Sequence, residues 1–194
     1  MPRERRFSQP EVLDQLTDAF TRHGYGGTSL AHLQQATGLG KQSLYNTFGD
    51  KQAMYLQAID CAVQRASPAV AAMDQAPDGR AALVRFFDTM AGDCAADDPA
   101  RKHCIVTSGL LEGVDEPPLA WALTSRWLAT HELLRATVER GQRDGSIANP
   151  APSAELAELL IGLVSGLRVA ARAGRSPAQM GRLVHLTLGV LDHA

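Results

Sequence analysis

The sequence predicts an all-α protein in which a small amino-terminal three-helix head, containing a helix-turn-helix, precedes a larger carboxy-terminal helical bundle. Only 5% of its 194 residues are aromatic, while 45% are hydrophobic, with abundant Ala and Leu that favour helices. Apolar residues recur at the spacing of amphipathic helices, and clusters of Pro, Gly and Asp separate these stretches. The length suffices for a small module and a larger domain with its own core. We therefore expect two domains, residues 1–50 and 51–194.

The first helix of the head is expected over residues 8–24. Ser8 and Glu11 have the spacing of a capping box, in which two side chains satisfy backbone amides of the first turn. Leu16 and Phe20 follow four residues apart and predict a buried face. This helix would support the two that follow.

Residues 29–37 and 41–48 predict two short helices joined by a tight turn. The hydroxyl of Thr28 or Ser29 can accept a hydrogen bond from an amide at the start of the first of them. Gly38 follows that helix, at a position where a left-handed backbone favours glycine. The turn has the length expected of a helix-turn-helix.

The second of these helices predicts a polar outer face. Leu44 and Phe48 lie four residues apart and can pack inward. The polar side chains left outside can bond base edges and phosphates of DNA. They are Lys41, Gln42, Ser43, Tyr45 and Asn46.

The stretch from residue 24 to residue 51 resembles the amino-terminal pattern of the TetR-type transcriptional repressors. The matching positions are Gly24, Tyr25, Gly27-Thr28-Ser29, Leu33-Gln34, Thr37-Gly38-Leu39-Gly40, Leu44-Tyr45, Phe48 and Lys51. Departures from the pattern, which bear on helix packing and operator sequence, are Gln34, Thr37, Gly40 and Gln42. The resemblance implies a homodimeric, ligand-responsive regulator, in most cases a repressor, that binds a palindromic operator and is released by a small-molecule effector.

In such a regulator, the second helix of the motif would enter the major groove of one operator half-site. Candidates for base contacts are Lys41, Gln42 and Ser43. Candidates for contacts with the DNA backbone are Thr28, Ser29, Tyr45, Asn46, Thr47 and Lys51. Two of them, Tyr45 and Thr47, could instead pack within or at the rim of the head.

The charge distribution agrees with a DNA-binding head. Residues 1–51 hold six basic and five acidic residues, whereas residues 52–194 hold thirteen and sixteen, so the sign of the balance changes near the boundary. A basic arm formed by Arg3, Arg5 and Arg6 could follow a phosphate backbone or enter a minor groove. A solvated tail is the alternative for this arm.

Asp50 can cap a fourth helix over residues 50–68, which would connect the two domains. Met54, Tyr55 and Ile59 supply its apolar face. Clusters of Pro, Gly and Asp separate the remaining helical stretches. The helices expected there cover residues 79–96, 101–113, 117–144, 153–173 and 177–192.

The helices expected over 153–173 and 177–192 have wide apolar faces with small residues interspersed, among them Gly162 and Gly166. Two such helices from each of two protomers could form a four-helix interface with twofold symmetry. In the resembling family this pair forms the dimer. The alternative is that both helices are core elements of a monomer.

Apolar and aromatic residues in the middle of the chain could line an effector pocket within the bundle. The same spacing also fits ordinary core packing, and His131 could be a hydrogen-bonded histidine rather than a ligand anchor. The candidates are Phe86, Phe87, Met90, Cys94, Cys104, Thr107, Leu111, Trp121, Trp127 and His131.

Cys104 allows a second interpretation of the sensor. Its surroundings resemble a Gly-Cys-hydrophobic segment of one branch of the family, in which some members sense oxidants or electrophiles through a cysteine, although His103 stands here in place of the glycine. The basic residues Arg101, Lys102 and His103 could favour the reactive thiolate. A small buried residue within a helix contact is the alternative.

Other classes of protein have little support in the sequence. We find no catalytic motif, no Gly-rich phosphate loop, and no Cys or His spacing typical of a metal site, so we expect neither enzyme nor cofactor. No apolar run approaches the length of a membrane span or a signal peptide, which predicts a soluble, cytoplasmic protein. A helical protein-interaction module without DNA binding remains as an alternative, but Lys41 and Lys51 speak against it.

Overall fold

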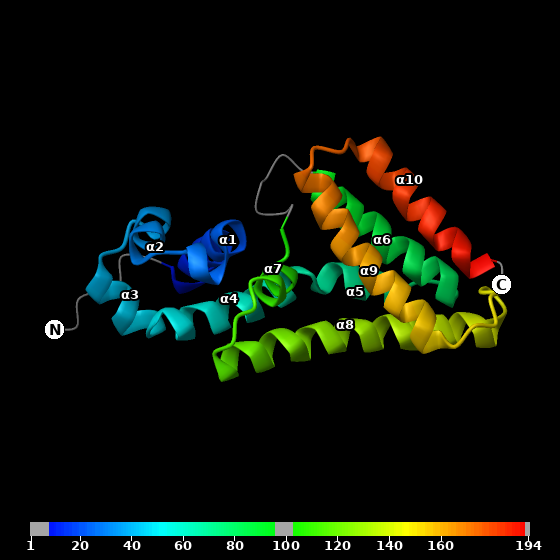
Figure 1. The fold of residues 1–194 in the computed structure, drawn as a ribbon, viewed down its shortest axis with the longest axis horizontal. Helices are drawn as coiled ribbons and strands as arrows, with labels where there is room; N and C mark the ends of the chain where they lie inside the picture. Colours follow the sequence, from blue (N-terminus) through cyan, green and yellow to red (C-terminus); the bar gives the residue numbers. More distant parts are fainter. Residues whose placement is uncertain (1–7, 96–102, 193–194) are drawn as a thin grey trace. The chain divides into compact units, whose positions relative to one another are not determined.

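The computed structural model describes residues 8–95 and 103–192, which form helices and connecting turns without strands (Figure 1). The predicted basic arm at Arg3, Arg5 and Arg6, and residues Arg101 and Lys102, lie outside the described residues. The described helices are α1 (Gln9–Gly27), α2 (Leu30–Thr37), α3 (Lys41–Phe48), α4 (Lys51–Arg65), α5 (Ser67–Asp74), α6 (Gly79–Ala95), α7 (Ile105–Leu111), α8 (Pro117–Asp144), α9 (Ser153–Arg172) and α10 (Pro177–Leu188), followed by a 3-10 turn, η2 (Gly189–Asp192).

The helices pack into two compact units. The first, here called the head unit, comprises the described residues of Met1–Arg65 together with Ile105–Thr124. The second, the bundle unit, comprises those of Ala66–Cys104 and Ser125–Ala194. The helix-turn-helix therefore packs together with α4, α7 and the first turns of α8, although residue 50 was the boundary expected from the sequence. The division of function between residues 1–50 and 51–194 stays a prediction.

The core of the head unit joins residues from both of its sequence segments. Leu16, Phe20, Leu44 and Tyr55 are fully buried, and the rings of Phe20 and Tyr55 meet edge to face with centroids 5.0 Å apart. Three buried side chains come from the later segment, namely Ile105, Leu119 and Leu123. The short helices α2 and α3 thus rest on a core that they could not bury alone.

Of the two sequence predictions about the ends of α1, one is wrong and one is confirmed. The capping box predicted from Ser8 and Glu11 is wrong, because the Ser8 hydroxyl accepts no hydrogen bond from the first turn. Pro10 lies within that turn and has no backbone N–H to offer. The expected end at Gly24 is confirmed as a break, since Gly24 has φ 72° and ψ 177° and interrupts the helix.

The helix predicted over 50–68 ends earlier, at Arg65, and is followed by α5, which the sequence did not predict. The predicted cap is present, because the Ala53 N–H donates to Asp50 Oδ1 over 2.8 Å. Pro68 lies in the first turn of α5, where a fixed φ and a missing N–H are tolerated. The proline therefore begins a helix rather than ending one.

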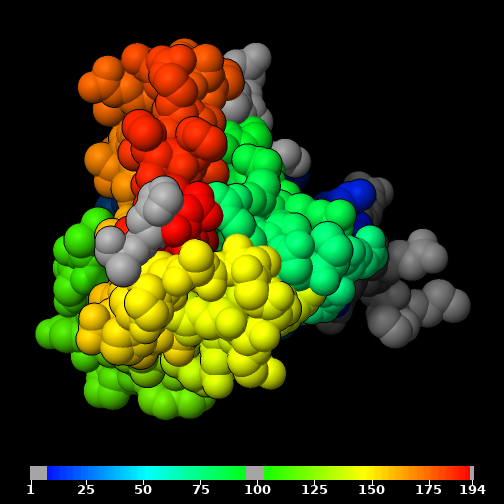
Figure 2. All heavy atoms as spheres, turned by 90° about the vertical axis from the view of Figure 1, so that its right-hand side faces the viewer, coloured from blue at the N-terminus to red at the C-terminus, as the bar shows by residue number. Residues whose placement is uncertain are grey.

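The bundle unit is built from α6, α9, α10, the later part of α8 and α5. Its core includes Leu83, Leu134, Leu160 and Leu167, each fully buried. Figure 2 shows the end of this unit, where the turn after α8 lies against η2. There the N–H groups of Ala148 and Asn149 both donate to the Leu191 carbonyl. Among the residues that the structure describes, no helix combines the length and apolar character needed to cross a membrane.

Candidate nucleic-acid interface

The two helices of the helix-turn-helix have the bounds predicted from the sequence, and the predicted cap at Ser29 and turn glycine at Gly38 are present. The Ser29 hydroxyl accepts from the His32 N–H, and His32 Nδ1 lies 3.3 Å from the Ser29 backbone nitrogen, so both ends of a capping box are present. Gly38 adopts φ 67° and ψ 7°, and its N–H donates to the Gln34 carbonyl over 2.8 Å. The Leu39 N–H donates to Thr37 Oγ1, so this threonine, one of the departures from the TetR-type pattern, stabilises the turn.

Thr28, the other predicted cap, has a different role. Its side chain is buried, and its hydroxyl donates to the Gly24 carbonyl within the same unit. It therefore fixes the chain before α2 rather than capping that helix. A backbone contact between Thr28 and DNA stays a prediction.

The outer face of α3 carries the side chains predicted to contact DNA. Lys41, Gln42, Ser43, Tyr45 and Asn46 are exposed, while Leu44 and Phe48 are buried. The Gln42 Nε2 group donates to Asn46 Oδ1 over 2.8 Å, and Lys41 Nζ lies 5.7 Å from the Tyr45 ring centroid. Each pair spans one helical turn, so two adjacent rows of donors and acceptors face outward. Thr47 is half-buried, at the edge of this face.

Lys51 lies at the start of α4, close to α2 and α3. It lines a small hollow of about 50 Å³ together with Leu30, Leu33, Tyr45 and Met54. Two residues predicted to contact phosphates, Tyr45 and Lys51, thus share one rim of the head unit. Lys51 Nζ also lies 4.5 Å from the ring centroid of Tyr25, a cation–π contact that restricts where the ammonium group can point.

The residues predicted to line an effector pocket are divided between the two units. Phe86, Phe87, Met90 and Cys94 are buried in the core of the bundle unit, with Trp127 packed against that core. Cys104 and His131 are half-buried in the same unit, and His131 Nε2 lies 3.3 Å from Glu158 Oε2. Thr107, Leu111 and Trp121 belong to the head unit, where Leu111 and Trp121 are 79% and 74% exposed. The pocket stays a prediction.

A larger open cavity, of about 350 Å³, lies in the head unit and contains none of those residues. His23 and His32 stack beside it with ring centroids 4.6 Å apart. Partial burial, with the positive charges of His32 and Arg22, lowers the pKa of His23. In the described ranges 8–95 and 103–192, no group of three His, Cys, Asp or Glu side chains is arranged to hold a metal ion.

The three cysteines differ in burial. Cys61 and Cys94 are buried, and burial raises the pKa of both thiols, which keeps them protonated. The Arg168 guanidinium lies beside Cys94 and partly opposes this effect. Cys104 is half-buried and therefore the most accessible of the three.

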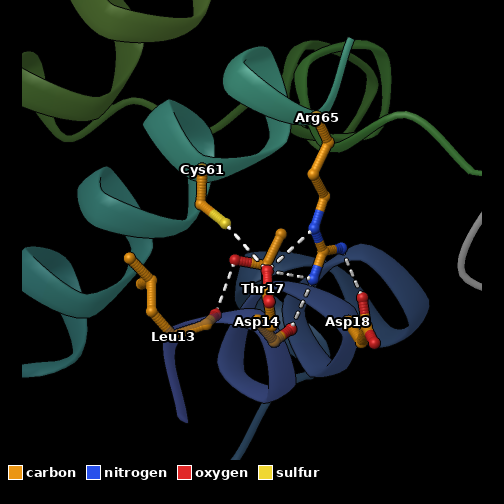
Figure 3. Close-up of polar contacts among 6 residues, drawn as sticks. All are labelled: Leu13, Asp14, Thr17, Asp18, Cys61 and Arg65. Atoms are coloured by element: carbon orange, nitrogen blue, oxygen red, sulfur yellow. Dashed lines mark hydrogen bonds and ion pairs between the residues drawn. The ribbon is translucent and has the colours of Figure 1, made fainter. Parts of the chain in front are cut away.

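Two sets of polar contacts in the head unit were not predicted from the sequence. Figure 3 shows Arg65 of α4 with Asp14 and Asp18 of α1, where it bonds both carboxylates. In the other set, Glu112 contacts the turn at Gly24 and Gly26. The hydrogen-bonded pairs are separated by 47 to 86 residues, and no periodicity in the sequence points to contacts of that range.

A capped helix-turn-helix with a polar outer helix is the arrangement typical of helix-turn-helix regulators of transcription. Comparison with known proteins supports this class. Residues 12–58 match the family model described as bacterial regulatory proteins, tetR family. The chain is 26% identical over 188 residues to the HTH-type transcriptional repressor ComR of Escherichia coli (strain K12), covering 96% of this chain and 90% of the relative.

Solved structures of TetR-family regulators have the same fold as this protein over nearly the whole chain. A double cysteine mutant of the TetR-family regulator CifR, complexed with 26-base-pair operator DNA, is 27% identical, has a TM-score of 0.87, and covers 96% of this chain and 98% of its own. A second cysteine mutant of CifR with operator DNA is 25% identical, also with a TM-score of 0.87, over 97% and 99% of the two chains. Residues 12–58 thus match the amino-terminal domain of the tetR family of bacterial regulatory proteins, and the proteins to which the whole chain is similar are transcriptional regulators rather than enzymes.

Proposed function

We propose that this protein is a homodimeric repressor that binds a palindromic operator and leaves it when a small molecule binds the bundle unit. The observation that carries DNA binding is the outer face of α3, where five exposed polar side chains surround a buried Leu44 and Phe48. CifR, the relative in the solved complexes, binds operator DNA through the same fold, and ComR is named as a repressor. This role would place the protein in the cytoplasm, in contact with the DNA that it regulates.

The side chains divide into two groups by the contacts that they can make. Lys41, Gln42 and Ser43, at the start of α3, are proposed to read base edges in the major groove. The proposed backbone contacts are those of Tyr45, Asn46, Thr47 and Lys51, with Thr28 and Ser29 at the start of α2. The hydrogen bond between Gln42 and Asn46 preorganises the two amides for such contacts.

The proposed dimer uses α9 and α10. Both helices keep large apolar side chains in contact with solvent, although each also packs into the core of the bundle unit. A second copy of the chain would cover these side chains and place two heads on one operator. Two half-sites on one face of DNA lie about 34–36 Å apart or a multiple of that distance. The exposed residues are Leu159 (48%), Val169 (62%), Leu183 (36%) and Leu186 (74%).

The effector is proposed to act by changing the separation of the two heads, which a fixed half-site spacing would not tolerate. A small molecule that fits the bundle unit is the first candidate. Because Cys104 is the most accessible of the three thiols, oxidation or alkylation at this residue is the second.

Selection of binding sites from random DNA, followed by affinity measurements over a series of salt concentrations, tests this proposal. We expect enrichment of a palindrome and a steep loss of affinity with salt. Repeating the selection with candidate effectors would identify the one that releases DNA. A protein that enriches no sequence and shows no salt-dependent DNA binding would instead favour an interaction module of the same fold.

A further inference from the structure

The turn that leads into the helix-turn-helix is held by a carboxylate from a distant part of the chain. We call residues 24–27 the elbow. It begins at Gly24, where positive φ breaks α1. Thr28 follows it directly, and the Thr28 N–H donates to the Tyr25 carbonyl while its hydroxyl donates to the Gly24 carbonyl. The elbow therefore sets the position of Ser29, the cap of α2, and with it the start of the DNA-reading motif.

Glu112, which follows α7, reaches the elbow directly. The Gly26 N–H donates to Glu112 Oε2 over 3.0 Å. A Cβ atom at Gly24 would overlap the Glu112 carboxylate, so the carboxylate occupies space that only glycine leaves free. Both contacts are made by one side chain 86 residues away from Gly26 in the sequence.

Glu116 extends the same contact to a predicted DNA-binding residue. Its carboxylate lies near the Tyr25 hydroxyl, and burial, together with the negative charges of Glu116 and Asp50, raises the pKa of Tyr25. The Tyr25 ring in turn lies under Lys51 Nζ. The segment from Glu112 to Glu116 thus touches the elbow and, through Tyr25, the lysine proposed to bind phosphate.

Close packing holds α7, the helix that immediately precedes Glu112, in place. A Cβ atom at Gly109 of α7 would lie 2.7 Å from Tyr55 Oη and 2.8 Å from Leu123, so α7 approaches its neighbours as closely as glycine allows. The Tyr55 hydroxyl also donates to the Ile105 carbonyl at the start of α7, over 3.4 Å. The carboxylate of Glu112 is therefore supported by α4 and by the first turns of α8.

We propose that Glu112 is a positioning residue for operator binding. It holds the elbow through Gly26, so that Ser29 and α3 keep the geometry that an operator requires. This inference rests on the proposed DNA-binding function. A carboxylate near a surface that binds phosphates would by itself repel DNA, so removing it should strengthen non-specific binding if charge were its only effect. A positioning role predicts the opposite result for the operator.

Full-length variants should be compared for their affinity for the selected operator and for random duplex DNA. For Glu112→Ala we expect about tenfold weaker operator binding and unchanged or slightly stronger binding to random DNA. Glu112→Gln, which keeps an oxygen acceptor for the Gly26 N–H, should recover most of the operator affinity. Asp115→Ala is the matched control, because Asp115 is an exposed carboxylate of the same segment without a described side-chain contact.

A double-mutant cycle tests the contact itself. Gly24→Ala should displace the Glu112 carboxylate, so its cost in operator affinity should be smaller in the Glu112→Ala background than in the wild type. Additive effects, or a Glu112→Ala variant with the same operator-to-random ratio as Asp115→Ala, would overturn the inference. Circular dichroism and thermal unfolding identify any variant that fails to fold. Failure of the wild type to prefer any operator would overturn the proposed function instead.

Discussion

Arg65, the last residue of α4, is held by Asp14 on α1. Its Nε and Nη2 groups lie 3.1 Å and 2.8 Å from Asp14 Oδ1, and its Nη1 group pairs with Asp18. Cys61 Sγ contacts the same Asp14 oxygen at 3.3 Å. This network joins the end of α4 to the supporting helix of the head unit (Figure 3).

Replacing Arg65 should destabilise the protein modestly and in a pH-dependent way. We expect Arg65→Ala to lower the free energy of unfolding by about 1 kcal/mol, because the paired side chains are partly exposed to solvent. The hydrogen bond from Arg65 lowers the pKa of Asp14 below its ordinary value of 3.8. The stabilisation is therefore complete above that pH and is lost as the pH falls below it.

Chemical denaturation of both proteins between pH 7 and pH 3 measures this difference. Arg175→Ala is a suitable control, since Arg175 is exposed and has no described side-chain contact. A difference that grew toward acid pH would contradict the assignment to Asp14.

Lys51→Ala should weaken binding to all DNA sequences alike. Loss of one phosphate contact should lower the slope of log affinity against log salt by about 1. Fluorescence anisotropy with the operator and with random duplex DNA, at several salt concentrations, measures both effects. A change in sequence preference at an unchanged salt slope would mean that Lys51 does not contact phosphate.

Gln42→Ala should change operator preference rather than salt dependence. If the Gln42 amide reads a base edge, its loss should cost about 1–3 kcal/mol at one or two operator positions and leave the others unchanged. Repeating the selection from random DNA with this variant would show which positions relax. Equal losses at every position would place Gln42 on the backbone instead.

Leu186→Glu should separate the protomers. Leu186 is 74% exposed on α10 in the single chain, and a carboxylate there would be buried by the proposed dimer at a high cost. Analytical ultracentrifugation should show monomers, and operator affinity should fall with dimerisation. Leu111→Glu, at a leucine of similar exposure outside α9 and α10, should leave the dimer intact. A dimer that persists in Leu186→Glu would argue against this face.

Cys104 should react with mild oxidants or alkylating agents before the other two thiols. Cys61 and Cys94 are buried, and burial raises the pKa of each, which disfavours the nucleophilic thiolate. Mass spectrometry of peptides after brief treatment measures the order of modification. An unreactive Cys104 would exclude the thiol-sensing version of the proposed function.

Local signals explain which parts of the fold were predictable. The bounds of α3, the cap at Ser29 and the left-handed Gly38 depend on neighbouring residues, so caps and spacing were enough to predict them. α5 was not predicted, because a proline such as Pro68 often follows the end of a helix, whereas here it lies in the first turn of α5. Apolar patterns also fail to distinguish core from surface at single positions, as the exposed Leu111 shows.

In the candidate site, too, local features were predictable and long-range contacts were not. The outward face of α3 was predictable because helical periodicity decides which side chains point away from Leu44 and Phe48. The contact of Glu112 with Gly26 was not, because it joins residues 86 positions apart that only the folded chain brings together. The same is true of the contact between Lys51 and Tyr25, because the positive charge of Lys51 was predictable but the aromatic ring beneath it was not.

The inclusion of residues 105–124 in the head unit limits how the protein can be divided. A fragment ending at residue 65 would lack Ile105, Leu119 and Leu123, which complete the core of the head unit. The space that these side chains fill would then be open to water. The unit that is proposed to bind DNA is thus encoded in two separate stretches of the gene. Exchanging heads between relatives would require both stretches to be transferred together.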